Sequence, residues 1–349
     1  MKVPTGKRGY DVKVGYLVET GRVEVREVEE PKVGEGDVLL RVTAAGICGS
    51  DIHAYHGTHP FRHAPMVLGH EVAGEVVAVG SAVRDVHVGD RVTVEPQKAC
   101  GVCVYCRQGA YNLCVTKVMA GVGGWIGSFA EYFVAPEERV YILPGDLDDD
   151  LGLLAEPLAV GVHAVKLAGV HADSTVAVLG TGPIGLLAAT AAQAANAKSV
   201  FCTDVNPFRL GVAREFGLHA LNAKEASVEN TILSYAPDGC DVVLLTVSSQ
   251  QALEQALRIV KRGGKVIVVS IFSAPVQIPL GVVQLNEIEL KGSNTYTRDD
   301  FLTAIKVLQA RCGDLTKVIT HHVTLEGINE AMEMLTNPLN EALKIVVQP

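Results

Sequence analysis

A glycine pattern at residues 178–185, VLGTGPIG, constrains the fold more than any other stretch of the chain. Its glycines follow the order G-x-G-x-x-G, between an apolar run typical of a buried strand (174–180) and an alanine-rich run typical of a helix (183–197). A tight turn without side chains lets the N–H groups at the helix start approach a pyrophosphate. The pattern therefore predicts a dinucleotide site. The residues assigned to it are Gly180, Gly182, Pro183, Ile184 and Gly185.

An acidic residue follows at the distance that such a site requires. Asp204 ends the next predicted strand, about 20 residues after Gly185, where a carboxylate can accept hydrogen bonds from the adenosine ribose. Its charge would also repel a 2′-phosphate, which favours NAD over NADP. Arg209 complicates this choice, because its guanidinium could stack on adenine or partly offset the repulsion. A glycine-rich turn that binds no ligand is the alternative interpretation.

The pattern of predicted elements divides the chain into two domains, as its length of 349 residues also favours. Val-rich runs separated by Gly, Asp and Pro predict strands over residues 11–95. Strands then alternate with helices, one of them expected over 250–264, which predicts a parallel sheet covered on both faces. We therefore expect an α/β chain with a Rossmann domain at 158–296 and a catalytic domain formed by 1–157 and 297–349.

Composition disfavours several other classes of protein. The net charge is −9 and there is no basic block, so nucleic acid and anionic membranes are not expected as partners. No uncharged apolar run reaches the roughly 18 residues that span a membrane. The first nineteen residues contain no apolar run of signal-peptide length, so we expect a cytoplasmic protein. In that reducing compartment, clustered cysteines are expected to bind metal rather than form disulfides.

Four of the eight cysteines lie in residues 99–114, ACGVCVYCRQGAYNLC, with the spacing C-x2-C-x2-C-x7-C. Four thiolates suit tetrahedral zinc and leave no open coordination position, so this site is predicted to be structural. An iron–sulfur cluster is the competing interpretation, but the bacterial ferredoxin run has a shorter last gap followed by proline. The ligands predicted for this lobe, at about 96–116, are Cys100, Cys103, Cys106 and Cys114.

A second set of potential ligands is spread over a much longer stretch of sequence. Cys48, His70, Glu71 and Glu156 offer one thiolate, one imidazole and two carboxylates. Catalytic zinc needs such an incomplete shell, with about three protein ligands and one open position. The run HEVAG is not H-E-x-x-H, which excludes a metalloprotease by that route. Taken singly, each of these residues also has a purely structural interpretation, as a buried thiol, a hydrogen-bonded histidine or a helix cap.

Together these motifs resemble the zinc-containing medium-chain dehydrogenases, close to the sorbitol (polyol) and threonine dehydrogenase branches. GICGSD, GHEVAGEVVAVG, CGVCVYCRQGAYNLC, AEPLAVGVHA and VLGTGPIG occur in the family order, and the resemblance extends from about residue 12 to the end. It implies a GroES-like β-barrel catalytic domain, a Rossmann domain and an active site in the cleft between them. It also implies a homotetramer or homodimer.

The resemblance implies two zinc ions per chain. Cys48, His70 and Glu71 would hold the catalytic ion, with Glu156 bound directly or through water. The implied reaction transfers hydride from a secondary alcohol of a polyol or sugar derivative to NAD and gives a ketone. L-threonine 3-dehydrogenase, a vicinal-diol dehydrogenase and a non-catalytic dinucleotide-binding relative are the alternatives.

The resemblance also implies contacts for the proton and the substrate. Ser50 would meet the alcohol, and His53 would end a proton relay through the nicotinamide ribose. Tyr296 matches a substrate-binding tyrosine of sorbitol dehydrogenases, whereas Thr295 replaces the arginine beside it, which disfavours sorbitol itself as the substrate. A short loop at 56–65 either lines the substrate cleft or is simply solvated. Its candidate residues are His56, His59, Arg62 and His63.

Overall fold

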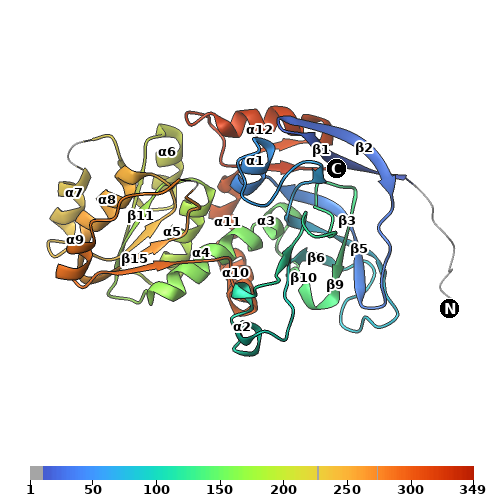
Figure 1. Cartoon of the computed structure of the whole chain (residues 1–349), viewed down its shortest axis with the longest axis horizontal. Helices are drawn as coiled ribbons and strands as arrows, with labels where there is room; N and C mark the ends of the chain where they lie inside the picture. Colours follow the sequence, from blue (N-terminus) through green and yellow to red (C-terminus); the bar gives the residue numbers. More distant parts are fainter. Residues whose placement is uncertain (1–10, 226–227, 273) are drawn as a thin grey trace.

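The computed structural model describes residues 11–225, 228–272 and 274–349, and these form two lobes side by side along the long axis (Figure 1). The lobe that contains the N-terminal strands is rich in β-structure, and the other is a layered α/β unit. Residues 1–10, on which the predicted absence of a signal peptide partly rests, lie outside the described residues. Among the described residues, no helix is both long enough and apolar enough to cross a membrane.

The main sheet of the β-rich lobe is organised around β3 (Asp37–Gly46). One edge of β3 pairs along its length with β5 (Glu71–Val79), and the other edge is shared by β9 (Tyr132–Pro136) and β18 (Lys344–Val347). The strand nearest the C-terminus thus completes a sheet that begins near the N-terminus. The remaining strands of this sheet are β6 (Arg91–Val94), β10 (Val140–Ile142) and β17 (Ile319–Val323).

Smaller elements surround this sheet. Their strands are β1 (Asp11–Glu19), β2 (Arg22–Glu29), β4 (Met66–Val67), β7 (Gln97–Lys98) and β8 (Val118–Met119). Their α-helices are α1 (Gly49–Tyr55), α2 (Val104–Arg107), α3 (Asp149–Leu153) and α12 (Ile328–Thr336). Single 3-10 turns are η1 (Tyr111–Leu113), η2 (Glu137–Arg139), η3 (Thr316–Val318) and η4 (Leu325–Gly327). The Val-rich runs predicted as strands before residue 95 correspond to β1, β2, β3, β5 and β6, so that prediction is confirmed.

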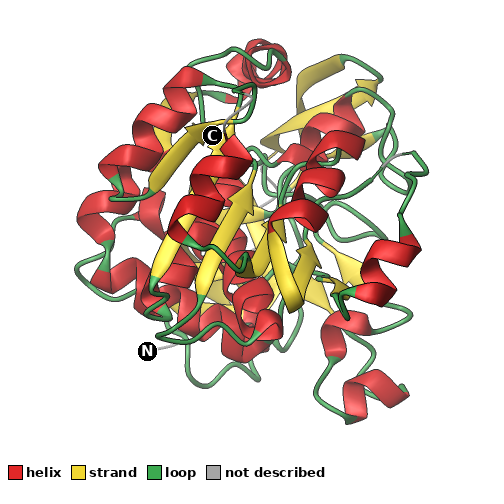
Figure 2. Ribbon diagram, turned by 90° about the vertical axis from the view of Figure 1, so that its left-hand side faces the viewer, coloured by secondary structure: helices red, strands yellow, loops and turns green. Residues whose placement is uncertain are grey.

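The α/β lobe is a six-stranded parallel sheet with helices on both faces (Figure 2). The strand order is β13-β12-β11-β14-β15-β16, so the order reverses between β11 (Thr175–Leu179) and β14 (Cys240–Leu245). In such sheets ligands bind at the carboxyl ends of the strands beside this reversal. The other strands are β12 (Ser199–Asp204), β13 (His219–Asn222), β15 (Val260–Val268) and β16 (Glu289–Gly292). The helices are α5 (Pro183–Ala194), α6 (Pro207–Glu215), α7 (Val228–Tyr235), α8 (Gln250–Ile259) and α9 (Leu280–Leu285).

The helix predicted over 250–264 is wrong at its C-terminal end. Helix α8 stops at Ile259, and Val260 already pairs with Cys240 as part of β15. Gly263 adopts a left-handed conformation with φ +68°, which a continuing helix does not allow. The helix ends at Ile259 because Val260 is already extended, with φ −74° and ψ 139°, and pairs as part of the sheet.

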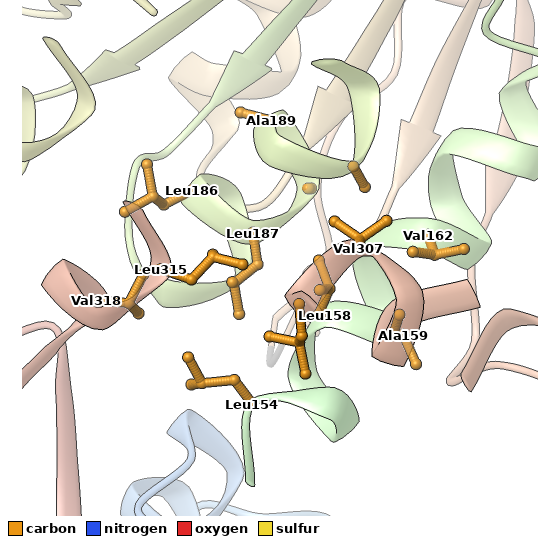
Figure 3. Close-up of a cluster of buried hydrophobic side chains, with 14 of the residues drawn as sticks. Leu154, Leu158, Ala159, Val162, Leu186, Leu187, Ala189, Val307, Leu315 and Val318 are labelled. Atoms are coloured by element: carbon orange, nitrogen blue, oxygen red, sulfur yellow. The ribbon is translucent and has the colours of Figure 1, made fainter. Parts of the chain in front are cut away.

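Helix α4 (Ala155–Ala168) lies between the two lobes, together with α10 (Arg298–Ala310) and the short α11 (Cys312–Leu315) (Figure 1). Figure 3 shows apolar side chains of α4, α5, α10 and α11 gathered into one buried cluster. Its fully buried members include Leu158, Leu187 and Leu315. The predicted domain boundary at residue 157 therefore falls inside helix α4, whose side chains pack against α5, α10 and α11. The domain boundaries themselves stay a prediction.

Candidate active site

Strand pairing brings three of the predicted metal ligands together. Gly46, the last residue of β3, lies opposite Glu71, the first residue of β5. Cys48 follows β3 and His70 precedes β5, so the two reach the same point. The ligand atoms of Cys48, His70 and Glu71 all lie within 4.8 Å of one another. A Cβ on Gly46 would stand 2.0 Å from Glu71 Oε2, so only glycine leaves room for this carboxylate.

One thiolate, one imidazole and one carboxylate are the donor types of catalytic zinc sites with an open position. The histidine and the glutamate are almost completely buried and the cysteine is half-buried. Buried ligands of this kind need either a cation or local partners to balance their charge. The donor set therefore fits a zinc ion, which this group of three would hold.

Asp51 positions two of these ligands, Cys48 and His70. Its side chain is fully buried in the first turn of α1. Its Oδ2 accepts a hydrogen bond from the N–H of Cys48 at 3.1 Å, and its Oδ1 accepts one from the N–H of Gly69 at 3.2 Å. Burial opposes its ionisation, but His70 and Arg62 hold the pKa of Asp51 well below its usual value. Such outer partners fix the orientation of metal ligands.

Lys344 is a residue that sequence reasoning missed. Its Nζ lies 2.7 Å from both carboxylate oxygens of Glu71 and donates to the carbonyl of Ile47 at 3.0 Å. The side chain is 1% exposed, at the start of β18. Burial alone would lower the pKa of Lys344, but the Glu71 carboxylate raises it. The sequence signal was a lysine at the start of the apolar run KIVV, where a buried charge needs a partner.

Glu156 lies outside the group of three. It stands in the first turn of α4, 5% exposed, and its Oε1 accepts a hydrogen bond from the Tyr296 hydroxyl at 2.9 Å. Burial raises the pKa of Glu156 to about 7, and the nearby Glu71 carboxylate adds to this effect. Tyr296 is fully buried, so the structure places its hydroxyl on Glu156. Contact between this tyrosine and a substrate stays a prediction.

The other predicted contact residues lie at varied distances from the metal group. Ser50 accepts a hydrogen bond from Arg62 at 3.1 Å, one residue away from Asp51 in α1. His53 is exposed one turn further on, with Nδ1 3.1 Å from the Thr58 hydroxyl, which suits a terminal proton acceptor. The ring of His56 instead contacts Thr336 on α12 at 2.9 Å.

Thr295, the predicted neighbour of the substrate, is held by two side chains near the cysteine lobe. Its hydroxyl accepts a hydrogen bond from Lys117 Nζ at 3.0 Å and donates one to Gln97 Oε1 at 3.3 Å. Its backbone has φ +47°, which is uncommon for a β-branched residue. Lys117 is thus the cation in contact with position 295.

The glycine pattern forms the turn that was predicted for it. Gly180 has φ +98°, and Gly182 is the N-cap of α5, with Pro183 as the first helical residue. A Cβ on Gly185 would stand 1.8 Å from the carbonyl oxygen of Gly180. Side chains are therefore excluded where the helix meets the strand, and the N-terminus of α5 is open to an anionic group.

Asp204 fixes this turn against the next strand. Its Oδ2 accepts a hydrogen bond from the N–H of Thr181 at 2.8 Å, and its Oδ1 accepts one from the N–H of Asn206 at 2.9 Å. Arg209 Nη1 lies 3.9 Å from Oδ2. Both Asp204 and Arg209 line a cavity of about 730 Å³ beside the glycines, which is large enough for part of a dinucleotide. Ribose recognition by Asp204 stays a prediction.

A smaller cavity, of about 230 Å³, connects the two halves of the site. Cys48 and Lys344 line it from the metal group, and Gly182, Gly185 and Arg209 line it from the dinucleotide turn. A ligand on the glycine turn and an ion at Cys48 would therefore face the same space.

The four clustered cysteines also converge as predicted. Their Sγ atoms lie within 4.8 Å of one another. The N–H of Cys103 donates to Cys100 Sγ at 3.3 Å, and the N–H of Cys100 donates to Cys114 Sγ at 3.3 Å. Hydrogen bonds from the N–H groups of Val102 and Cys103 lower the pKa of Cys100 to about 6. Four thiols so arranged suit zinc with no open position.

Comparisons with known proteins agree with this geometry. The family model "Alcohol dehydrogenase GroES-like domain" matches residues 34–145, and the model "Zinc-binding dehydrogenase" matches 183–310. Sorbitol dehydrogenase of Bacillus subtilis (strain 168) is 35% identical over 97% of this chain and 98% of its own length. L-threonine 3-dehydrogenase of Vibrio parahaemolyticus serotype O3:K6 is 33% identical over 90% of this chain and 92% of its own.

A solved structure shows the same overall fold. The crystal structure of 2R,3R-butanediol dehydrogenase from Bacillus subtilis superposes with a TM-score of 0.89 at 32% identity, covering 97% of this chain and 99% of that one. The β-rich lobe is thus a GroES-like domain, and the α/β lobe is of the Rossmann type. The residues matched by the first family model include Cys48, His70 and Glu71. The chain belongs to the zinc-type medium-chain dehydrogenases.

Proposed function

We propose that this protein is an NAD-dependent zinc oxidoreductase that oxidises a secondary hydroxyl of a polyol or sugar derivative to a ketone. The observation that carries the proposal is the cavity that Cys48 and the glycine turn line together. Hydride transfer requires the reacting carbon to lie between a group that polarises its oxygen and the nicotinamide ring. A dinucleotide-binding relative without activity has no need for an incomplete ligand set in that place.

When bound, zinc would supply Lewis acidity that favours loss of the alcohol proton, and the nicotinamide would accept the hydride. The chain itself would orient these partners. Cys48, His70 and Glu71 would hold the ion, and the N-terminus of α5 would hold the pyrophosphate. Ser50 would pass the proton on, and the exposed His53 would release it to solvent.

The test is oxidation of a panel of alcohols followed at the absorbance of reduced nicotinamide, with NAD and NADP in parallel. The panel contains polyols, vicinal diols and L-threonine. We expect turnover of polyols with NAD, and loss of that turnover in Cys48→Ser. Turnover of L-threonine alone, or none with any alcohol, would contradict the proposal.

Metal content provides a separate check. We propose two zinc ions per chain, a catalytic one at Cys48 and a structural one in the cysteine lobe, so metal analysis should give about two. Cys48→Ser should lower the count by about one. We further propose a cytoplasmic homotetramer or homodimer, which light scattering of the purified protein would test.

A further inference from the structure

Arg62 is a buried cation in contact with His70 of the metal group. It comes from the 56–65 loop and is 5% exposed. Its Nη1 lies 3.1 Å from Asp51 Oδ1, donates to the Ser50 hydroxyl at 3.1 Å and lies 3.5 Å from His70 Nδ1. The Nη1 end of the guanidinium is therefore held beside His70, a proposed zinc ligand, and beside Ser50, the hydroxyl that would meet the alcohol.

The other edge of the same guanidinium has no partner. Among the described residues, neither Nε nor Nη2 of Arg62 has a hydrogen-bond acceptor, and both atoms are buried. These two nitrogens lie on the same edge of the planar group, where their N–H bonds point in parallel. This is the fork that binds both oxygens of a carboxylate or a phosphate. Buried donors are nearly always paired, so an unpaired fork indicates a missing acceptor.

A cavity that could admit such an acceptor lies beside Arg62. Arg62 lines a cavity of about 640 Å³, together with His63, Gly121 and Trp125. A Cβ on Gly121 would stand 2.9 Å from Nη2, so the glycine keeps this flank free of side-chain atoms. Glu29 also lines the cavity, but its side chain is 77% exposed and lies 3.5 Å from Lys32. The only buried charge that lines the cavity, among the described residues, is the guanidinium.

We propose that the Nε–Nη2 fork of Arg62 binds an anionic group of the substrate, so that the preferred alcohol is an acidic sugar derivative rather than a neutral polyol. The other end of the guanidinium touches Ser50, so the anion would lie along the carbon chain from the reacting hydroxyl. This inference rests on the proposed function, because it names the substrate class of the same site. A carboxylate and a phosphate monoester share the recognised chemistry.

Steady-state kinetics test the substrate class with three alcohols of one skeleton: D-sorbitol, D-gluconate and D-sorbitol 6-phosphate. We expect kcat/KM for one of the anionic alcohols to exceed that for D-sorbitol at least about tenfold. Arg62→Lys keeps the charge beside Asp51 but lacks the fork, so the ratio should fall to about one. Arg84→Lys, the same change at an exposed arginine of the same lobe, should leave the ratio unchanged.

Binding can be measured without turnover, because Trp125 is the only tryptophan of the chain and lines the cavity. D-gluconate and inorganic phosphate are titrated separately against its fluorescence, with D-sorbitol as the neutral probe. A saturable change with gluconate identifies a carboxylate, and one with phosphate identifies a phosphate. In either case Arg62→Lys should abolish it. Equal responses to sorbitol, or an unchanged response in the variant, would overturn the inference.

The two proposals fail in different ways. Oxidation of neutral polyols without any preference for anions would refute only the role of Arg62. Anion binding reported by Trp125, with no alcohol oxidised, would leave the anion site standing and refute the proposed function.

Discussion

At the scale of single residues, several carboxylates are fully buried and depend on the hydrogen-bond donors around them. Asp51, Glu71, Glu95 and Asp300 are each no more than 1% exposed, and each is surrounded by donors. Glu95 alone accepts hydrogen bonds from the side chains of two tyrosines, one arginine and one glutamine. A carboxylate so placed is stable only while its donors remain, so each is a sensitive point for substitution.

Asp300 gives the first prediction, since its hydrogen-bond partners include none of the proposed zinc ligands. It accepts hydrogen bonds from the Thr297 N–H at 2.9 Å and from Lys166 Nζ at 3.0 Å, and its Oδ2 lies 2.7 Å from His163 Nδ1. Burial opposes ionisation, but these partners hold the pKa of Asp300 well below its usual value. Asp300→Asn should cost about 1.5–3 kcal/mol of unfolding free energy at pH 7.

The pH dependence of that loss has a defined sign. A carboxyl whose pKa is lower in the folded state stabilises the fold above its unfolded pKa of about 4, and the stabilisation fades as pH falls below that value. The difference between wild type and Asp300→Asn, measured by urea unfolding from pH 7 to pH 3, should therefore shrink in acid. Asp299→Asn, on the exposed side of the same helical turn, should show a small loss. A gap that stays constant with pH would contradict the ionic role.

The sequence could identify some site residues but not others, for a physical reason. Cys48, His70 and Glu71 stand in short local motifs, and strand pairing then brings them together. Lys344 contacts Glu71 across 273 positions, and no local pattern encodes that distance. The free fork of Arg62 was equally invisible, because an unmet hydrogen bond becomes evident only when every neighbour has been placed.

At the scale of elements, the cysteine lobe has almost no apolar core of its own. Helix α2 buries none of its four residues, and Val102, Val104 and Val115 are more than half exposed. Figure 1 shows α2 at the lower edge of the molecule. A segment that cannot stabilise itself by burial depends on its metal for its fold.

Cys103→Ser should therefore lower zinc content by about one ion per chain and lower the melting temperature, with a smaller effect on kcat. The physical reason is that three thiolates hold zinc less tightly than four, whereas no residue of 96–116 lines the 230 Å³ cavity beside Cys48. Calorimetry and metal analysis measure the first two effects. Cys312→Ser, at a half-buried cysteine outside the lobe, is the control. Normal melting with lost turnover would argue for a catalytic lobe.

The turn between β11 and α5 gives a sharper steric prediction. A Cβ on Gly185 would stand 1.8 Å from the carbonyl oxygen of Gly180, so Gly185→Ala must displace the helix start. NAD affinity, measured by calorimetric titration, should fall by about tenfold or more, because the pyrophosphate would lose aligned N–H donors. Gly211→Ala in α6, where a Cβ meets nothing within 4 Å, should leave affinity unchanged. An unaltered Kd in Gly185→Ala would exclude this turn as the binding site.

Local periodicity identified most elements but placed one boundary badly. Continuous apolar runs located β11, β12 and β14, because the central strands of a parallel sheet covered on both faces are buried on both sides. The helices α5 and α6 between them were also predicted, whereas α7 was not. The end of α8 depended instead on Val260, which is extended and pairs with Cys240 of β14. β13 was missed, since His219–Asn222 has no strong apolar pattern and is held mainly by pairing with β12.

At the scale of the whole molecule, the C-terminal elements pack against earlier parts of the chain. β18, near the C-terminus, pairs with β3, and α10 packs on α4 and α5. The sequence indicated that the C-terminal elements return to the first lobe, but which side chains join the lobes could not be inferred from it. The 230 Å³ cavity, lined by residues of both lobes, lies at this junction, so contacts between lobes should affect binding as well as stability.

Asn206 is the side chain that tests this connection. It is 1% exposed, and its Oδ1 caps α6 by accepting from the Phe208 N–H at 2.9 Å. Its Nδ2 donates to the carbonyls of Pro338 and Asn340 at 3.1 Å and 2.7 Å. One amide thus joins the dinucleotide lobe to the loop before β18, and Pro338 also lines the 730 Å³ cavity.

Two substitutions separate the cap from the connection. Serine is a good N-cap but cannot reach the two carbonyls, so Asn206→Ser should lose about 1–3 kcal/mol of unfolding free energy from the contact between lobes. Asn206→Ala should lose about 1 kcal/mol more, from the cap. Both should weaken NAD binding severalfold, because the loop that closes the cavity is released. Asn329→Ser breaks a similar pair of hydrogen bonds to Val23 within one lobe, and it should lower stability without changing the Kd for NAD. If Asn206→Ser lowers stability as much as this control and also leaves the Kd unchanged, the contact holds the lobes together without shaping the cavity between them.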